Sequence, residues 1–265
     1  MAGIATELAS FVEKTTFNEL PEHLVDQMKL LVLDAIGCAV RGHSTDCGRI
    51  SAELARKLGG NAGSTIMGMP DKVAVTNAAF ANGQLISALD YHPMGTSHDA
   101  PAIAAAALSI LETTQNTGKD LIISILLGLE ITRRITYAAE FQGISSSVFG
   151  AAASAGKLLH LNQEKLANAI GLAGFITIPD TLMKYISTHP SQMVKYGPTG
   201  WIAQAGVTAA LLADMGFTGD TDLFEGEKNY WRFTGKTKSD ASGVTANLGK
   251  QWETHVEFKL YPGGI

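Results

Sequence analysis

Residues 82–110 read NGQLISALDYHPMGTSHDAPAIAAAALSI. The stretch begins with apolar residues at helical spacing and ends with a second apolar segment in which alanine predominates. Between them, residues 90–99 bring together carboxylate, imidazole and hydroxyl side chains. Ser97, Asp99 or both are placed to cap the second segment, because short polar side chains accept hydrogen bonds from the first free N–H groups of a helix. The stretch therefore predicts two helices joined by a polar loop.

The same combination of apolar periodicity and small residues predicts helices along most of the chain. Pro21 and Gly42 bracket one segment and the pair Gly59-Gly60 ends the next, a common distribution of proline and glycine around helices. In approximate bounds, the predicted helices are 21–42, 46–60, 74–89, 100–113, 119–140, 148–159, 163–173 and 200–215. Residues 64–70, STIMGMP, are compatible with either a strand or a turn. Since alanine and glycine let helix axes approach closely, we predict an all-α multi-helix bundle with no sheet larger than a hairpin.

The helical pattern weakens after about residue 225, where polar residues and glycines become frequent. This part of the sequence predicts a loop, a short helix and then an extended HVEFKLYP segment at 255–262. We therefore expect one helical domain over residues 1–265, with a bundle in about 1–225 and an irregular extension in 226–265.

Composition and charge exclude several functions. Charged residues make up only 17% of the chain, so much of the helix surface must be covered by other helices or by a partner, and we expect a homodimer or a larger assembly. The net charge of −5 lacks the basic footprint of a nucleic-acid-binding protein. The longest apolar stretch, 121–131, is shorter than the roughly 20 residues of a membrane span. The first residues do not resemble a signal peptide, and we expect a cytoplasmic protein.

Familiar catalytic and metal-binding motifs are incomplete or missing. Gly235-Lys236-Thr237 resembles the end of a phosphate-binding loop, but Tyr230 stands where the upstream glycine is required. No G-x-S-x-G or H-E-x-x-H motif occurs, and Cys38 and Cys47 have no metal-ligand spacing. The sequence therefore gives no support for a nucleotide, serine-hydrolase or zinc-protease site.

The polar loop is the strongest candidate for a functional site. Asp90, His92, Thr96, His98 and Asp99 lie between two predicted helix ends, where titratable groups are well placed to meet an anionic substrate. The alternative is an ordinary capped loop between two helices.

Several blocks in one order resemble the MmgE/PrpD family, which includes 2-methylcitrate dehydratase and cis-aconitate decarboxylase. NGQLISALDY at 82–91 and SHDAPAIAAAALSI at 97–110 are similar to the two halves of a characteristic family motif. Other similar blocks are LVLDAIGCAVRG at 31–42, DLIISILLGLEITRRI at 120–135, SSVFGAAASAGKLLHLNQEKLANAIGLAG at 146–174 and VKYGPTGWIAQAGVTAALLADMGFTGDTDLFEG at 194–226. The resemblance implies the large helical domain of that fold, without the second, α+β domain that follows the FKxYP segment in the family.

The resemblance also implies roles for particular residues. Asp90, His98 and Lys195 correspond to catalytic positions, and Lys259, in FKLYP, corresponds to a lysine at the start of the second domain. The alternatives are a helix-end hydrogen bond for Asp90, an ordinary loop histidine for His98, a solvated lysine for Lys195 and a strand-edge charge for Lys259. We expect His92, Thr96, Gln142 and Lys259 to contribute to substrate binding.

The chain departs from the family pattern in three places within the expected site. The loop between Asp90 and His98 is shorter than usual, and the family's second acidic residue is replaced around His92. Gln142 stands where the family has a histidine, and glutamine hydrogen-bonds but does not shuttle protons at neutral pH.

The resemblance implies a lyase that dehydrates or decarboxylates a small di- or tricarboxylic acid, with neither a metal nor another cofactor. Lysine and histidine donors would stabilise the enolate charge of such a reaction, and a neutral histidine would move the proton. Two alternatives stay open. One is an isomerase, epimerase or cyclase that uses the same pocket for a different substrate, and the other is a non-catalytic partner subunit.

Overall fold

The computed structural model describes residues 3–94, 98–139, 144–178, 187–236 and 238–263. Its helices are α1 Ile4–Lys14, α2 Glu22–Gly42, α3 Asp46–Leu58, α4 Val75–Ser87, α5 Ala100–Leu111, α6 Gly118–Tyr137, α7 Ser147–Leu158, α8 Gln163–Phe175, α10 Pro198–Asp214 and the short α11 Tyr230–Phe233. Short 3₁₀ turns are η1 Phe17–Glu19, η2 Met193–Tyr196 and η3 Ala241–Gly243. The only sheet in the described residues pairs β1 Ser64–Thr65 with β2 Lys72–Val73. These elements confirm the predicted all-α bundle.

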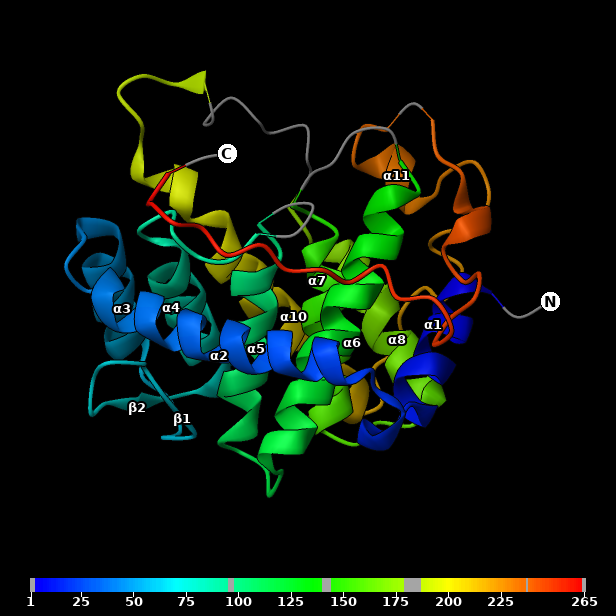
Figure 1. The fold of residues 1–265 in the computed structure, drawn as a ribbon, viewed down its shortest axis with the longest axis horizontal. Helices are drawn as coiled ribbons and strands as arrows, with labels where there is room; N and C mark the ends of the chain where they lie inside the picture. The colour runs from blue at the N-terminus through cyan, green and yellow to red at the C-terminus, as the bar shows by residue number, and fades with distance from the viewer. Residues whose placement is uncertain (1–2, 95–97, 140–143, 179–186, 237, 264–265) are drawn as a thin grey trace.

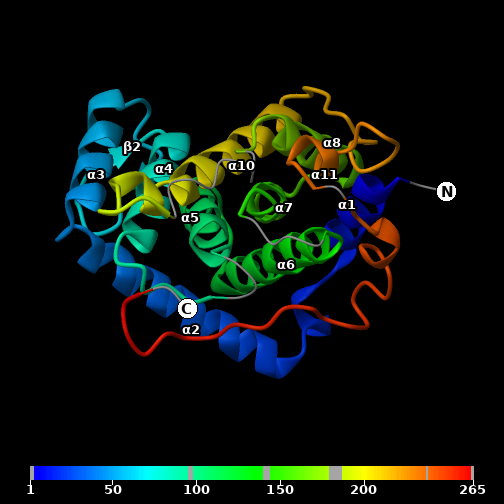
Figure 2. The same ribbon diagram turned by 90° about the horizontal axis from the view of Figure 1, so that it is seen from above.

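The helices are arranged around a buried centre. Figures 1 and 2 show α5, α6 and α7 inside a ring to which α2, α3, α4, α8 and α10 contribute. Nearly every residue of the three central helices is buried, including the whole run 121–136 of α6. Helices buried on all sides consist mainly of apolar and small residues, so the low charge content of the sequence follows from the architecture.

Glycine sets how closely two pairs of helices approach. A Cβ on Gly83 of α4 would lie 2.8 Å from the Cα of Gly200 in α10, and one on Gly128 of α6 would lie 2.7 Å from the carbonyl oxygen of Gly150 in α7. Both distances are too short for any larger side chain. The crossing at Gly83 brings the end of α4 next to the start of α10, which positions two parts of the candidate site.

The helix starts follow from local sequence. Asp99 Oδ1 accepts a hydrogen bond from the Ala100 N–H at 2.9 Å, which confirms the predicted cap of α5 for this residue. Ser97, the other capping candidate, lies outside the described residues. Asn162 caps α8 and Thr117 forms a capping box with Asp120 at the start of α6.

Two details go beyond the sequence predictions. Residues 64–70, predicted as either a strand or a turn, contain both. β1 is followed by the turn of a two-stranded hairpin in which Ser64 lies opposite Val73. Helix α1 lies outside the predicted ranges, yet it buries Ala5, Leu8, Ala9 and Val12 along one face. Among the described helices, none has the length and apolarity that crossing a membrane requires.

Residues 244–263, which we call the C-terminal strap, begin with turns at 244–250 and then cross the bundle with little regular secondary structure. In Figure 1 the red trace of the strap passes in front of the central helices, and in Figure 2 it crosses over α2. It forms an isolated antiparallel bridge between Glu257 and Met94, with hydrogen bonds of 2.8 and 2.9 Å. The strap therefore ends beside the loop that follows α4.

Candidate active site

Three parts of the chain that are distant in sequence, the loop after α4, η2 and the strap, meet at one carboxylate, Asp90. Asp90 itself follows α4, His98 precedes α5, Lys195 belongs to η2, and Lys259 lies on the strap. Lys259 Nζ is 2.9 Å from Asp90 Oδ1, and Lys195 Nζ is 3.7 Å from Asp90 Oδ2. The structure therefore brings together the described residues to which the sequence assigned catalytic roles.

The backbone at Asp90 is held in an unusual conformation. Its φ angle of 50° lies in the left-handed region, which aspartate tolerates better than most residues but rarely adopts. The Asp90 carbonyl accepts hydrogen bonds from the Gly263 N–H and from Lys259 Nζ, both at 2.9 Å. These contacts with the strap stabilise a conformation that turns the chain sharply after α4.

The ammonium group of Lys259 is fully engaged within the protein. It donates to Asp90 Oδ1 and the Asp90 carbonyl, and to the Gly263 carbonyl at 2.7 Å. These three acceptors match the three donors of a lysine. In this arrangement Lys259 supplies positive charge to the site but no free N–H group.

Lys195 is more accessible. Its side chain is 30% exposed, against 8% for Lys259, and its contact with Asp90 is longer. Ser87, in the last turn of α4, places it: the Ser87 hydroxyl donates to the Tyr196 carbonyl at 2.7 Å and thereby ties η2 to α4. Lys195 is thus the ammonium of the site that has donors available for a ligand.

A histidine pair borders the carboxylate. His92 Nε2 and His98 Nδ1 lie 2.7 Å apart, a hydrogen-bond distance. Burial and, to a smaller extent, electrostatic interactions with His98 and Lys259 lower the pKa of His92 to about 3, against an opposing contribution from Asp90. Burial also lowers the pKa of His98, although the negative charge of Asp90 opposes that shift. Both imidazoles are therefore neutral at pH 7.

The carboxylate is charged at the same pH. Burial raises the pKa of Asp90, but the hydrogen bond and charge of Lys259, with smaller contributions from His98 and His92, leave the pKa below its ordinary value. The site then holds one negative charge and two ammonium groups, so its net character is positive.

Sequence reasoning missed a buried arginine behind the loop. Arg133 Nε lies 3.5 Å from Asp99 Oδ2, and both side chains are fully buried. Arg133 also donates to the Glu253 carbonyl of the strap at 3.5 Å. It therefore connects α6 with the start of α5 and with the strap.

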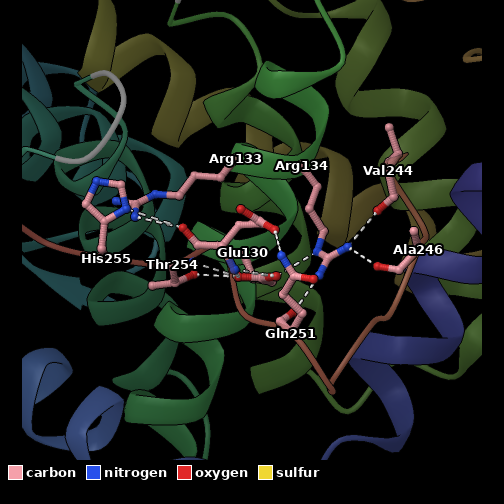
Figure 3. A network of polar contacts seen from close by, with 9 residues as sticks. Glu130, Arg133, Arg134, Val244, Ala246, Gln251, Thr254 and His255 are labelled. Carbon is pink, nitrogen blue, oxygen red and sulfur yellow. Dashed lines mark hydrogen bonds and ion pairs between the residues drawn. The ribbon is translucent and has the colours of Figure 1, made fainter. Parts of the chain in front are cut away.

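A second missed pair anchors the strap. Glu130 Oε1 and Arg134 Nε, one turn apart on α6, lie 2.6 Å apart and are almost completely buried (Figure 3). Glu130 accepts hydrogen bonds from the Glu253 and Thr254 N–H groups and from the Thr254 hydroxyl. Arg134 donates to three strap carbonyls, those of Val244, Ala246 and Gln251. The signal was present in the sequence as two opposite charges within an otherwise apolar helix.

Two predicted site residues lie outside the described residues. They are Thr96 and Gln142, and their predicted part in substrate binding stays a prediction.

The arrangement fits an anion better than a cation. Asp90, His92 and His98 each offer a ligand atom within 4.8 Å of the others, which is close enough for a shared metal ion. However, Lys259 already occupies Asp90 Oδ1 and Lys195 faces Oδ2. A cation would have to displace or approach these ammonium groups at a Coulombic cost, whereas a carboxylate of a substrate would be attracted by them.

Known proteins match the chain along most of its length. The family model described as the MmgE/PrpD N-terminal domain matches residues 6–241. Human cis-aconitate decarboxylase is 24% identical over 287 residues, covering 100% of this chain and 57% of the human protein. The cis-aconitate decarboxylase of Aspergillus terreus is 26% identical over 287 residues, covering 98% of this chain and 57% of the fungal protein. The chain therefore spans somewhat more than half the length of these relatives.

The match to the family model includes the end of α4, the polar loop and η2 in their observed order. The strap, with Lys259, lies beyond the matched range but within the region aligned with the decarboxylases. On this evidence the chain belongs to the MmgE/PrpD family and corresponds to its N-terminal, helical domain.

Proposed function

We propose that the protein acts as a lyase on a small di- or tricarboxylic acid, by dehydration or decarboxylation through acid–base chemistry. The observation that carries the proposal is the convergence of Lys195, Lys259 and His98 around Asp90. Loss of water or carbon dioxide from such an acid builds enolate charge beside carboxylates, and cationic and N–H donors stabilise that charge. The relatives named cis-aconitate decarboxylase support the same class of reaction.

Each residue has a distinct part in the proposed reaction. Lys195 binds a substrate carboxylate, because its ammonium group is accessible and its contact with Asp90 is long. Lys259 and Asp90 form a fixed pair that maintains the charge and shape of the site. His98 is the group that hydrogen-bonds to the reacting part of the substrate or exchanges a proton with it. These steps use only side chains of the protein and require no metal or other cofactor.

Product analysis tests the proposal. The purified protein is incubated with cis-aconitate, citrate and 2-methylcitrate, and substrate and product masses are measured by liquid chromatography and mass spectrometry. We expect at least one of these acids to lose carbon dioxide or water. A product of unchanged mass would instead indicate an isomerase. Neither binding nor conversion of any of the acids would contradict the proposal and favour a non-catalytic subunit.

Two lysine variants provide the matched control. Lys195→Ala should abolish or strongly reduce conversion, because it removes the accessible ammonium group. Lys29→Ala should leave conversion unchanged, since Lys29 lies on the exposed side of α2 and, among the described residues, forms its ion pair with Asp26 at 2.9 Å. Equal loss in both variants would show that the effect is not specific to the site.

A further inference from the structure

We propose that His92 sets the tautomer of His98, so that neutral His98 carries its proton on Nε2 and offers a hydrogen-bond donor to the substrate. The proposal rests on the proposed function for the role of His98 in the reaction, but the tautomer itself is a property of the protein without substrate. His92 would then be a positioning residue that acts through His98.

The first step is the contact between the two rings. His92 Nε2 and His98 Nδ1 are 2.7 Å apart, with ring centroids 4.9 Å apart and planes inclined by 61°. Two neutral imidazoles at this distance share one proton, so one nitrogen donates and the other accepts. The direction of this bond decides which nitrogen of each ring carries a hydrogen.

The second step concerns His92 Nδ1, the ring nitrogen that does not face His98. His92 is 2% exposed, and its Nδ1 is buried without a hydrogen-bond partner among the described residues. If Nδ1 carried the proton, a buried N–H group would be left without an acceptor among the described residues, which is destabilising. A bare nitrogen at the same place leaves only an unused lone pair, which is less costly. His92 therefore carries its proton on Nε2 and donates it to His98 Nδ1.

The third step is that the hydrogen bond keeps its direction, from His92 to His98, at neutral pH. Burial keeps His92 neutral, and the groups that act on it electrostatically are His98, Lys259 and Asp90. His98 is influenced by Asp90 and Asp99, which favour protonation, and by burial, Lys259 and Lys195, which oppose it. With neither ring charged, His98 Nδ1 is the acceptor and its hydrogen must be on Nε2.

The consequence concerns the role of His98. With its lone pair directed at His92, His98 does not begin the reaction as a base at Nε2. It hydrogen-bonds through Nε2–H to the substrate oxygen on which enolate charge develops, and a neutral imidazole is an effective donor for such an oxygen. His92 thereby selects between the two parts that the proposed function allows for His98.

Nitrogen NMR of the protein labelled with ¹⁵N-histidine measures the tautomer directly, at pH 7.5 and without substrate. We expect protonated Nε2 and unprotonated Nδ1 in both His92 and His98. The signals are assigned by comparison with spectra of His92→Gln and His98→Gln. A protonated Nδ1 in His98 would overturn the proposal, whatever activity the protein has.

A pair of isosteric variants tests the cause. His92→Gln keeps an N–H donor near the position of Nε2, so His98 should keep its proton on Nε2. His92→Glu replaces the donor by an acceptor and should move the proton of His98 to Nδ1. An unchanged His98 spectrum in folded His92→Glu would contradict the assignment of His92 as the determinant. If His92→Glu does not fold, His92→Phe takes its place in the test. We then expect His98 to show a mixture of both tautomers, and an unchanged His98 spectrum would contradict the proposal.

The outcomes separate this inference from the proposed function. Absence of turnover together with the expected spectra would reject the lyase and leave the tautomer assignment intact. Turnover together with a protonated Nδ1 in His98 would support the lyase and reject the role of His92.

Discussion

Lys195 and Lys259 both contact Asp90, but they differ in how many N–H donors remain free. The three donors of Lys259 are used by Asp90 and Gly263, whereas Lys195 makes a longer contact with Asp90, lies over the Tyr196 ring and is partly exposed. The sequence assigned both lysines to the site, Lys195 to catalysis and Lys259 to binding. The geometry refines this, because only Lys195 has the freedom to bind a ligand.

This difference predicts the effect of removing each ammonium group. Lys195→Met should weaken binding of tricarballylate, an unreactive tricarboxylate, about 10–100-fold, since hydrogen bonds to charged groups contribute about 1.5–3 kcal/mol. Calorimetric titration measures the change, with Lys29→Met as the exposed control. Equal dissociation constants for Lys195→Met and the unchanged protein would contradict this role.

The buried histidine predicts how stability depends on pH. The pKa of His92 is lowered in the folded protein to about 3, so protons bind more tightly to the unfolded chain. Its contribution is complete above the ordinary histidine pKa of about 6.5 and is lost as the pH falls toward 3. Asp90, whose pKa is also lowered, adds a loss in the same direction below about pH 4.

Urea denaturation between pH 8 and 4 checks this dependence. The free energy of unfolding should decline below about pH 6.5, and His92→Gln should make the decline shallower. His23→Gln is the matched control, because His23 is exposed on α2 and should leave the slope unchanged. The same slope in all three proteins would mean that His92 is not the titrating group.

At the scale of elements, the C-terminal strap has little regular structure of its own and depends on α6. Glu130 and Arg134 replace the hydrogen bonds that a neighbouring strand would provide, with partners at residues 244, 246, 251, 253 and 254. The strap then carries Lys259 to Asp90. The buried Glu130–Arg134 pair of α6 thus helps to hold Lys259 at the site, although neither residue of the pair contacts the site.

Removing one member of this pair should be severely destabilising. Arg134→Met would leave the Glu130 carboxylate buried without its cation, which typically costs about 3–5 kcal/mol. Denaturation measures the loss, and hydrogen exchange should show faster exchange of the Glu253 and Thr254 N–H groups. The exposed pair of Arg49 and Asp46 gives the control, because Arg49→Met should cost less than about 1 kcal/mol. A loss of similar size in both variants would contradict the anchoring role.

Helices could be predicted from the sequence where the pattern that determines them lies within a few neighbouring residues. Periodicity gave the central helices, and the Asp99 cap and the break after α2 follow from residues within one turn of the helix ends. Helix α1 was missed because its small amphipathic face resembles many short segments. The contacts of the strap were beyond prediction, since they join residues more than 100 positions apart through backbone groups that no side-chain pattern reveals.

At the scale of the whole molecule, the site depends on three long-range connections. The crossing of Gly83 and Gly200 sets α10 against α4, Ser87 ties η2 to α4, and the strap returns to the loop after α4. The polar loop pointed to Asp90 and His98, and the family resemblance added Lys195 and Lys259; the structure places the four close together, and their roles stay predictions. The bond between His92 and His98 and the saturation of Lys259 required coordinates, because they depend on distances rather than on residue types.

The outer surface predicts self-association. Leu33 and Val40 on α2 are 68% and 53% exposed, and Leu58 on α3 is 59% exposed in the single chain. Exposed apolar residues of this size on neighbouring helices favour a partner, and we propose a homodimer. Sedimentation should show a dimer at micromolar concentration that the double variant Leu33→Asp, Val40→Asp dissociates. Met215→Asp, at the end of α10 and 83% exposed, should leave it intact. A monomeric unchanged protein would contradict the proposal.

A crystal structure with tricarballylate bound tests the central claim most directly, because the claim concerns where a polycarboxylate binds. We predict one ligand carboxylate within about 3 Å of Lys195 Nζ and a ligand oxygen at a similar distance from His98 Nε2, with Lys259 still bound to Asp90. Tricarballylate bound elsewhere, with Lys195 and His98 making no contact to it, would contradict the account.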